Sequence, residues 1–275
     1  MKLVTIRTAN GTRAGRLDGD IVVELPDSDV GAILAGGAAS LAAAAAADGP
    51  RHAYADVDLA PVVPRPPKII CIGQNYMAHI AEMGSTPPKF PTLFAKYTRA
   101  LIGPRDAITL PKVSDKIDWE VELAIVIGSE GRHLTVDNAM DVVAGYTVLN
   151  DVSARDFQRR TEQWLQGKTF EGSTPLGPVL VTKDELDPSD LALTTEVDGQ
   201  TMQSSRTSDL LFKPAEILAY ISQIITLEPG DVIATGTPSG VGSGRNPQVW
   251  LKAGQTVTCT VEGIGSVVNR CVAEA

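Results

Sequence analysis

The segment Asp118–Gly128 constrains the fold of this 275-residue chain more than any other. From Leu123 to Ile127 it is an uninterrupted apolar run, which is typical of a strand buried on both faces. Glu120 and Glu122 stand at its beginning, and the alternation of side chains along a strand places them on one face, about 7 Å apart. Two like charges that enter a core are unfavourable unless a positive charge meets them. The segment therefore predicts a buried strand that begins either at a solvated end or at a bound cation.

A third carboxylate follows a second predicted buried strand. Gly145–Asn150 has the pattern of such a strand, and Asp151 comes directly after it. Ends of strands are where α/β-type architectures gather ligands. Three carboxylates, with water completing the shell, suit a hard octahedral ion such as Mg²⁺ or Mn²⁺ better than Zn²⁺. None of the three histidines and three cysteines stands at the spacing of a Cys/His zinc site. From spacing alone, a metal site and a solvated strand end are equally good interpretations.

His79 and Glu82 form the second candidate group. A helix is predicted over residues 76–83, with Asn75 as its N-cap and Gly84 as its stop, and it places both side chains on one face. A carboxylate beside an imidazole orients the ring and raises its basicity, which suits it to take a proton from water near neutral pH. The alternative is a surface pair at a helix end.

Two further polar residues stand in predicted turns. Lys168 precedes the turn Glu171–Pro175, where it could bind a substrate carboxylate as a point charge, although most lysines are simply solvated. Thr237 lies in the glycine-rich segment Thr235–Gly244, where it could donate its hydroxyl while neighbouring backbone N–H groups stay open as an anion nest. Neither residue is specific when taken alone.

The overall pattern predicts an α+β, β-rich fold, because strands dominate, helices are few and no regular βαβ alternation appears. Turn dipeptides predict a small β meander over residues 1–25, followed by an alanine-rich surface helix within residues 28–48. Prolines concentrate over residues 60–67, and proline cannot supply the hydrogen-bond donors of a sheet. We place a boundary there, with a small N-terminal α/β domain over residues 1–62 and a larger domain over residues 63–275.

Two helices are predicted within the larger domain. Residues 153–166 have helical spacing, with Phe157, Thr161 and Trp164 on one side, and a second helix is predicted over residues 214–225. Motifs for other enzyme classes fail. Gly167-Lys168-Thr169 lacks the earlier glycine of a phosphate-binding loop, the glycine-rich segment is not followed by a helix as a dinucleotide fingerprint requires, and no nucleophile elbow is present.

The charge balance excludes further classes. The chain has 24 Lys and Arg against 33 Asp and Glu, a net charge of −9, and phosphate binding begins with a positive field. We therefore expect neither a nucleic-acid partner nor attraction to an anionic membrane. No apolar stretch approaches the roughly 20 residues that span a bilayer. The odd number of cysteines, with no leading apolar run that resembles a signal sequence, predicts a cytoplasmic protein.

Five separated motifs combine into a resemblance. They are Ile72–Tyr76 with His79 and Glu82, Glu120–Leu123, Asn150–Gln158, Gly167–Phe170 and Thr235–Gly242. In order and spacing they closely resemble the fumarylacetoacetate hydrolase superfamily, and the match runs from about residue 66 to the C-terminus. The resemblance implies a mixed β-roll fold with an additional small N-terminal domain, and a homodimer.

The resemblance also implies roles for the site residues. Glu120, Glu122 and Asp151 would hold Mg²⁺ or Mn²⁺, and the ion would bind the oxygens of a small-molecule 2-oxo acid. His79 and Glu82 would form a catalytic dyad that activates water, on a segment that orders as a lid when substrate binds.

The resemblance implies roles at four further positions, and this chain departs from the family at two others. Lys168 would lie near metal and substrate as a catalytic residue, Arg155 and Gln158 would face the pocket, and Thr237 would contact the carboxylate side of the substrate. The family often has lysine-proline where this chain has Lys96-Tyr97, and often aspartate where Glu171 stands. Because both positions are expected to line or support the pocket, the identity of the substrate stays open.

These parts predict a metal-dependent hydrolase that cleaves a carbon–carbon bond in an acylpyruvate such as fumarylpyruvate, and releases pyruvate and a carboxylic acid. The alternative is isomerisation or decarboxylation of a 5-carboxymethyl-2-hydroxymuconate-type diacid in aromatic catabolism, which needs the same metal but no attack by water. Retention of both His79 and Glu82 favours the hydrolase. A non-catalytic metal-binding protein is a third interpretation, and the intact set of site residues argues against it.

Overall fold

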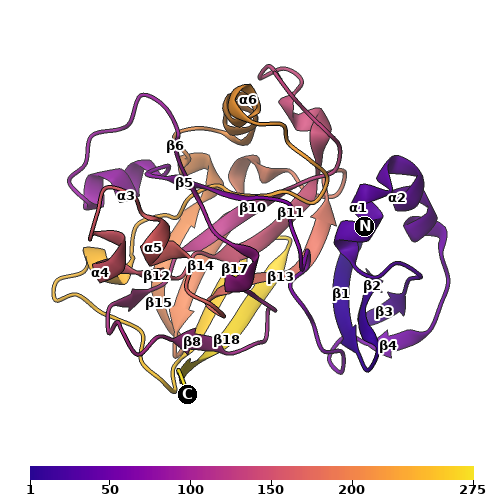
Figure 1. The fold of residues 1–275 in the computed structure, drawn as a ribbon, viewed down its shortest axis with the longest axis horizontal. Helices are drawn as coiled ribbons and strands as arrows, with labels where there is room; N and C mark the ends of the chain where they lie inside the picture. The colour runs from indigo at the N-terminus through magenta and orange to yellow at the C-terminus, as the bar shows by residue number, and fades with distance from the viewer.

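Strands make up most of the regular structure in the computed structural model, which describes residues 1–275 (Figure 1). The helices are α1 (Val30–Ala35), α2 (Gly37–Ala46), α3 (Met77–Glu82), α4 (Arg155–Gln158), α5 (Leu165–Lys168) and α6 (Pro214–Ile224). The strands are β1 (Lys2–Thr8), β2 (Gly11–Asp18), β3 (Ile21–Glu24), β4 (Arg51–Ala53), β5 (Ile69–Gly73), β6 (Thr92–Ala95), β7 (Leu101–Ile102), β8 (Ile108–Leu110), β9 (Ile117–Asp118), β10 (Val121–Ile127), β11 (Val143–Asn150), β12 (Ser153–Ala154), β13 (Thr174–Thr182), β14 (Ala192–Val197), β15 (Gln200–Arg206), β16 (Val232–Ala234), β17 (Thr256–Val261) and β18 (Gly265–Ala273). The predicted α+β, β-rich class is confirmed.

The centre of the fold is a mixed sheet of eleven strands in the order β4-β3-β2-β1-β13-β11-β10-β16-β5-β6, with β7 paired beside β13. Every residue of β10, β11 and β13 is buried, which confirms the two buried strands predicted from their apolar runs. β10 and β11 are antiparallel, with Val121 opposite Asn150. The N–H of Asp151 donates to the carbonyl of Glu120 over 2.9 Å. Antiparallel pairing therefore brings the beginning of β10 beside the end of β11.

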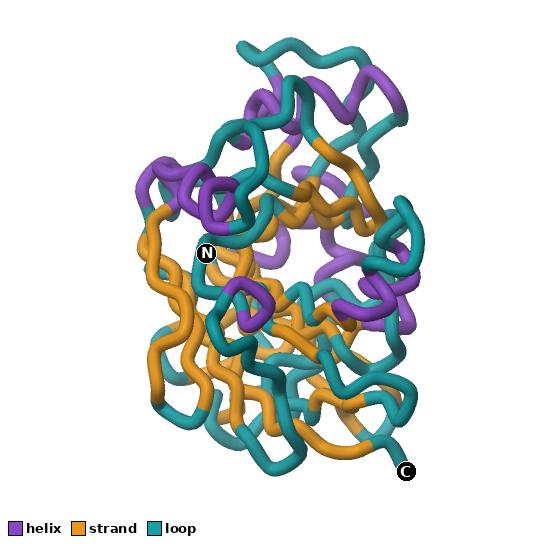
Figure 2. The backbone as a smooth tube through the Cα atoms, turned by 90° about the vertical axis from the view of Figure 1, so that its left-hand side faces the viewer, coloured by secondary structure: helices purple, strands orange, loops and turns teal.

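A second sheet, in the order β15-β14-β17-β18-β8, covers one face of the first. Buried residues alternate along β14 and β17, as expected for strands with one face on the core. Leu193 and Val257 of this sheet belong to the same hydrophobic cluster as Val121 and Val148 of the main sheet. Figure 2 shows the strands gathered mostly in the lower part of the molecule, with the helices above and beside them.

The N-terminal elements form a lobe at the right of Figure 1, with β1 to β4 backed by α1 and α2. The predicted β meander over residues 1–25 is present as β1, β2 and β3. β1 also pairs with β13, Lys2 opposite Val181, so this sheet continues into the main one. The domain boundary at residue 62 stays a prediction, since the sheet runs across it.

Two helix predictions were wrong in extent. The segment 28–48 forms two helices instead of one, and the second begins at Gly37, whose φ of +68° is a left-handed conformation that interrupts a helix. The segment 153–166 contains the single turns α4 and α5. A side chain at Gly167 would lie 2.4 Å from the backbone nitrogen of Gln158, so the two turns pack backbone against backbone. By contrast, α6 confirms the helix predicted over residues 214–225.

The helix α3 confirms the segment predicted over residues 76–83, but not its cap. Tyr76 takes the N-cap position, while the amide of Asn75 donates to the carbonyls of Phe212 and Thr235 and accepts from the N–H of Phe212. Asn75 therefore joins two distant segments instead of capping its own helix. None of the helices combines the length and hydrophobicity that spanning a bilayer requires.

Candidate metal centre and active site

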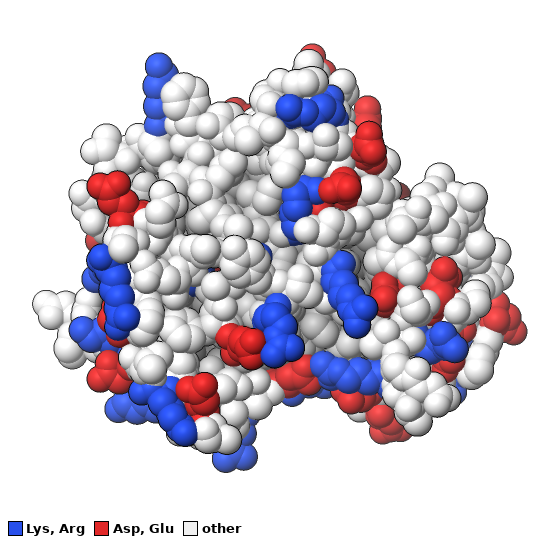
Figure 3. All heavy atoms as spheres, viewed as in Figure 1, with Lys and Arg blue, Asp and Glu red and all other residues white.

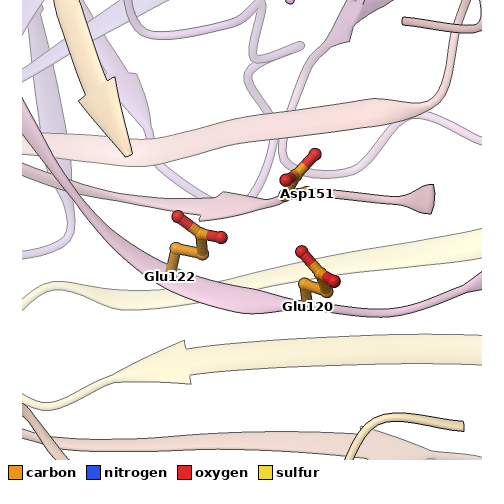
Figure 4. Close-up of side chains that lie close together, drawn as sticks. All are labelled: Glu120, Glu122 and Asp151. Atoms are coloured by element: carbon orange, nitrogen blue, oxygen red, sulfur yellow. The ribbon is translucent and has the colours of Figure 1, made fainter. Parts of the chain in front are cut away.

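The three predicted carboxylates lie together in the core of the sheet. One oxygen each from Glu120, Glu122 and Asp151 can be chosen so that all lie within 4.8 Å of one another. Figure 4 shows the two glutamates leaving one strand and Asp151 leaving its neighbour, with all three side chains pointing to the same side. Their exposed fractions are 5%, 1% and 0%. A solvated strand end is thus ruled out, because these carboxylates are buried.

Two lysines neutralise part of this charge. The Nζ of Lys168 lies 2.6 Å from Glu120 Oε2 and 2.8 Å from Asp151 Oδ2. The Nζ of Lys96 donates to Asp151 Oδ1 over 2.6 Å and to the carbonyl of Val152 over 3.2 Å. Both ammonium groups are buried. Lys96 was given no role of its own, although the resemblance led us to expect its position to line or support the pocket. Apart from that, its signal in the sequence is a cation directly after the apolar residues of β6.

The two lysines act unequally on the carboxylates. Burial works against ionisation of Asp151, but the attraction of Lys168 and Lys96 outweighs it and lowers the pKa of Asp151 to about 2. Burial raises the pKa of Glu122 well above its ordinary value, and the neighbouring Asp151 and Glu120 raise it further. The charge of Lys168 lowers the pKa of Glu122 in part, as does the N–H of Gly236, which donates to Glu122 Oε2 over 2.7 Å. Without a further cation, a negative charge on Glu122 is less favourable than one on Asp151.

The donor set fits a divalent cation. Four buried carboxylates face three buried cations: Asp118, Glu120, Glu122 and Asp151 against Lys96, Arg155 and Lys168. A doubly charged ion would turn this excess of negative charge into an excess of positive charge. It would also stabilise a negative charge on Glu122 directly. Carboxylate oxygens are the ligands that Mg²⁺ and Mn²⁺ prefer, and no histidine or cysteine is part of the cluster.

Arg155 links the cluster to a buried aspartate that was not predicted as a site residue. Its Nε donates to Asp118 Oδ2 over 2.8 Å, and its Nη1 donates to Gln158 Oε1 over 3.0 Å. Its Nη2 lies 2.7 Å from Glu120 Oε1, at ion-pair distance but without the geometry of a hydrogen bond. Burial works against the charge, yet Asp118 and Glu120 raise the pKa of Arg155.

The predicted dyad is assembled on α3. His79 Nδ1 lies 2.9 Å from Glu82 Oε2, and the other oxygen, Oε1, accepts the N–H of Gly240 over 2.9 Å. This contact ties α3 to the glycine-rich segment. Gly244 lies close beside it, because a side chain at that position would lie 2.7 Å from the carboxyl carbon of Glu82. The dyad therefore depends on a close approach between two segments far apart in the sequence.

The glycine-rich segment Thr235–Gly244 does not form the open anion nest that was predicted. Carboxylates of the protein already occupy four of its N–H groups: Gly236 donates to Glu122, Gly240 to Glu82, and Gly242 and Ser243 to Asp118. The Thr237 hydroxyl donates to the carbonyl of Val121 over 2.9 Å and accepts from Gln203 over 2.8 Å. The segment thus holds the acidic side chains of the site in place.

A polar cavity of about 370 Å³ joins the dyad to the cluster. Seven of the nine predicted site residues line it: His79, Glu120, Glu122, Arg155, Gln158, Lys168 and Thr237. The other two, Glu82 and Asp151, are bonded to lining residues. Arg159, Trp164 and Phe94 also line the cavity and were not predicted.

The position of Glu171 corrects an expectation. It was expected to line or support the pocket, but its side chain is 68% exposed and pairs with Arg99 over 3.0 Å, away from the cavity.

The face shown in Figure 3 carries acidic and basic side chains interspersed, without a continuous patch of either sign.

The chain is similar to known proteins over most of its length. Residues 68–272 match the family described as fumarylacetoacetate (FAA) hydrolase C-terminal. The rat (Rattus norvegicus) mitochondrial oxaloacetate tautomerase Fahd2a is 49% identical over 216 residues, which cover 78% of this chain and 69% of that protein. A fumarylacetoacetate hydrolase from Exiguobacterium antarcticum superposes with a TM-score of 0.89 at 36% identity, and covers 100% of both chains. A 5-carboxymethyl-2-hydroxymuconate delta-isomerase from Mycobacterium smegmatis superposes with a TM-score of 0.83 at 39% identity, again over 100% of both chains.

Proposed function

This chain belongs to the fumarylacetoacetate hydrolase family, and from that premise we propose that it is a divalent-metal-dependent enzyme that interconverts the enol and keto forms of a short 2-oxo diacid such as oxaloacetate. The observation that carries the proposal is one cavity of about 370 Å³ lined by both a carboxylate cluster and a histidine held by a glutamate. A relative 49% identical is named an oxaloacetate tautomerase, which supports this choice of substrate.

Residues Glu120, Glu122 and Asp151 would hold the ion, as their burial and donor chemistry favour. When bound, a divalent ion supplies Lewis acidity at the 2-oxo oxygen and a template for the neighbouring carboxylate. Lys168 contacts two of these carboxylates and lines the cavity, so its ammonium group is placed to keep them oriented beside the substrate.

In the enol-to-keto direction, His79 would give a proton to the carbon next to the oxo group, and the enol hydroxyl would release its proton to solvent. The keto-to-enol direction reverses both transfers. The Nδ1 of His79 faces Glu82, which leaves Nε2 as the nitrogen that exchanges the proton. Glu82 fixes the orientation of the ring. Because Glu82 is itself fixed by Gly240, the imidazole keeps its direction while the proton moves.

Arg159 favours a substrate with a second carboxylate. Arg155 and Lys168 also line the cavity, but each is already held by two carboxylates of the protein. Arg159 is the lining cation without such a partner. A guanidinium group binds a carboxylate well through paired hydrogen bonds. The second carboxylate of a diacid would supply that partner.

Hydrolysis of an acylpyruvate is the second candidate. The hydrogen bond between His79 and Glu82 is the observation that favours it, since the same pair could take a proton from water instead of from carbon. The two reactions differ in their products, because only hydrolysis consumes water and releases pyruvate. Isomerisation of a hydroxymuconate-type diacid is close to the first proposal, since it is also a proton shift without attack by water.

The test is a substrate panel with purified protein and added Mn²⁺. Loss of enol-oxaloacetate is followed by its ultraviolet absorbance, release of pyruvate is followed from fumarylpyruvate, and carbon dioxide and isomerised product are followed from a hydroxymuconate. We expect the enol to disappear faster than in buffer with Mn²⁺ alone, and a Glu122→Gln variant to show only the buffer rate. Release of pyruvate as the fastest reaction would favour the hydrolase, and no acceleration with any substrate would support a non-catalytic protein.

A further inference from the structure

Asp118 is the most completely bonded carboxylate near the site. It is 0% exposed and stands at the end of β9, two residues before Glu120. Its Oδ1 accepts the N–H of Gly242 over 2.6 Å, and its Oδ2 accepts the N–H of Ser243 over 2.9 Å. Oδ2 also accepts Arg155 Nε over 2.8 Å. Both oxygens are therefore used by the protein, and Asp118 is not among the carboxylates that could hold the ion.

The three nitrogens of the Arg155 guanidinium group each face a different side chain. Arg155 directs Nε to Asp118, Nη1 to Gln158 and Nη2 to Glu120. A planar guanidinium group has its donors in a fixed arrangement, so fixing Nε also fixes the direction of both Nη groups. Arg155 and Gln158 both line the cavity. The position of one buried aspartate thus sets where a cavity-lining cation stands relative to a candidate metal ligand.

We propose that Asp118 is a positioning residue that holds Arg155 away from full pairing with Glu120 and so keeps Glu120 available to the ion. With Asp118 present, the charge of Arg155 is shared between two carboxylates. Without it, Glu120 becomes the one carboxylate partner of a buried guanidinium group, and a buried ion pair without competition is strong. Glu120 would then turn toward Arg155 and leave the cluster.

The same aspartate sets the position of the glycine-rich segment. By accepting the N–H groups of Gly242 and Ser243, Asp118 fixes the part of the segment that follows Gly240, the residue that binds Glu82. Loss of Asp118 therefore acts on the cluster through Arg155 and on the dyad through the segment. A merely structural aspartate would lower stability without changing how the protein binds a metal ion.

The first experiment measures Mn²⁺ binding by calorimetry, without substrate. We expect Asp118→Asn to weaken binding by about 10- to 100-fold, the usual range for residues that orient metal ligands. The matched control is Asp231→Asn. Asp231 is also 0% exposed, accepts the N–H of Glu228 over 2.8 Å and pairs with Lys68 over 2.9 Å, outside the site. Asp231→Asn is expected to lower stability and to keep wild-type Mn²⁺ affinity. Equal Mn²⁺ affinities in the two variants would overturn the proposal.

A second experiment separates positioning from loss of charge. Asp118→Asn also removes a negative charge near the ion, and that effect would persist in an Arg155→Met background. Positioning through Arg155 would not persist, so we expect Asp118→Asn to weaken Mn²⁺ binding no further once Arg155 is methionine. Losses that add in the double variant would contradict the proposal, because they would mean that Asp118 acts independently of Arg155.

If Asp118→Asn does not fold, Arg155→Lys provides the test. Lysine keeps the charge but cannot reach Asp118, Gln158 and Glu120 from one rigid group. We expect a loss of Mn²⁺ affinity similar to that of Asp118→Asn, and wild-type affinity would overturn the proposal. The turnover of each variant, split into kcat and KM, rests on the proposed function. The Mn²⁺ measurements do not, so a wrong substrate would leave them unaffected.

Discussion

The carboxylate cluster and the His79–Glu82 pair face one cavity, but the chain builds them in opposite ways. The cluster leaves the ends of β10 and β11, whose residues are all buried. The pair belongs to the six-residue helix α3, of which Ile80 is the one buried residue. The side chains of His79 and Glu82 are 12% and 20% exposed, against 6% for Glu120 and 0% for Asp151.

Because they differ in burial, the cluster and the His79–Glu82 pair should also differ in rigidity. Ligands for an ion must stay in fixed positions, and strands in the middle of a sheet provide them. A helix with few buried contacts costs little to displace, so it suits residues that must let substrate enter. We expect changes in the cluster to alter metal binding, and to lower stability where they break a buried ion pair. We expect changes in the dyad to alter turnover alone.

The largest effect should follow loss of the ion. Chelation, or replacement of Glu122 by Gln, is expected to lower kcat/KM by more than about 10³-fold, because a metal ion contributes several kcal/mol to transition-state stabilisation. The measurement is the disappearance of enol-oxaloacetate before and after Mn²⁺ is restored. Wild-type protein should recover and Glu122→Gln should not. Undiminished turnover in chelator would remove the metal from the proposed function.

Replacing His79 by Ala should lower kcat by about 10²- to 10⁴-fold, the usual contribution of a general acid or base. Mn²⁺ affinity and the midpoint of thermal unfolding should stay at wild-type values, since the side chain lies on a helix with little buried surface. His133→Ala is the control, because that histidine contacts Gln223 at the surface. If His79→Ala also weakened Mn²⁺ binding, the two regions would not be separate.

In metal-free protein, Asp151→Asn is expected to lower the free energy of unfolding by about 3–5 kcal/mol, because Lys96 and Lys168 lose the carboxylate that both contact. Glu122→Gln should not destabilise the metal-free protein, since burial already disfavours the charged form of Glu122. Denaturant unfolding in the presence of chelator measures both. Equal losses in the two variants would show that the lysines do not act preferentially on Asp151.

The pH dependence of metal-free stability should show the same asymmetry. The pKa of Glu122 is raised on folding, so its contribution is complete below about pH 4.3 and is lost as the pH rises through the folded pKa, with a slope of at most about 1.4 kcal/mol per pH unit. The pKa of Asp151 is lowered to about 2, so its contribution is present above about pH 3.9 and is lost as the pH falls toward 2. Unfolding at a series of pH values should show a flatter alkaline side in Glu122→Gln. An unchanged profile would contradict the raised pKa.

The smallest effect is expected from Asp209, which holds the first turn of α3 through a hydrogen bond. Asp209 Oδ2 accepts the N–H of Ala78 over 3.2 Å, and so caps the first turn of the helix from another segment. Asp209→Ala should cost about 1 kcal/mol of local stability, as loss of a cap usually does. Faster amide hydrogen exchange in α3, with unchanged global unfolding, is the expected result. Asp190→Ala is the control, because its carboxylate pairs with Arg206 and not with α3. Unchanged exchange in α3 would show that other contacts hold the helix.

Much of the site followed from local patterns. Apolar runs that continue on both faces can be stable only inside a sheet, so β10 and β11 were predictable as buried strands with Glu120, Glu122 and Asp151 at their ends. Local spacing left open whether these carboxylates are buried or solvated. The spacing of His79 and Glu82 likewise required only one turn of helix. The homodimer, the cytoplasmic location and the domain boundary at residue 62 stay predictions.

Other features depended on segments that meet only in the folded chain. A lysine after a strand or an aspartate before Trp119 is compatible with many environments. Asp118 therefore gave no clear signal, and only the family resemblance placed Lys96 near the pocket. The helical spacing of residues 153–166 was satisfied locally, yet the segment forms two separate turns that pack against each other at Gly167 and Gln158.

By itself, then, the sequence determined which side chains must leave buried strands and which polar pair shares a helix face. Only the tertiary structure decided which cations meet those carboxylates and which N–H groups the glycine-rich segment presents to them. The physical reason is that burial can be inferred from the periodicity of neighbouring residues. The energy of a buried ion pair, by contrast, depends on distances between residues that the sequence does not place together.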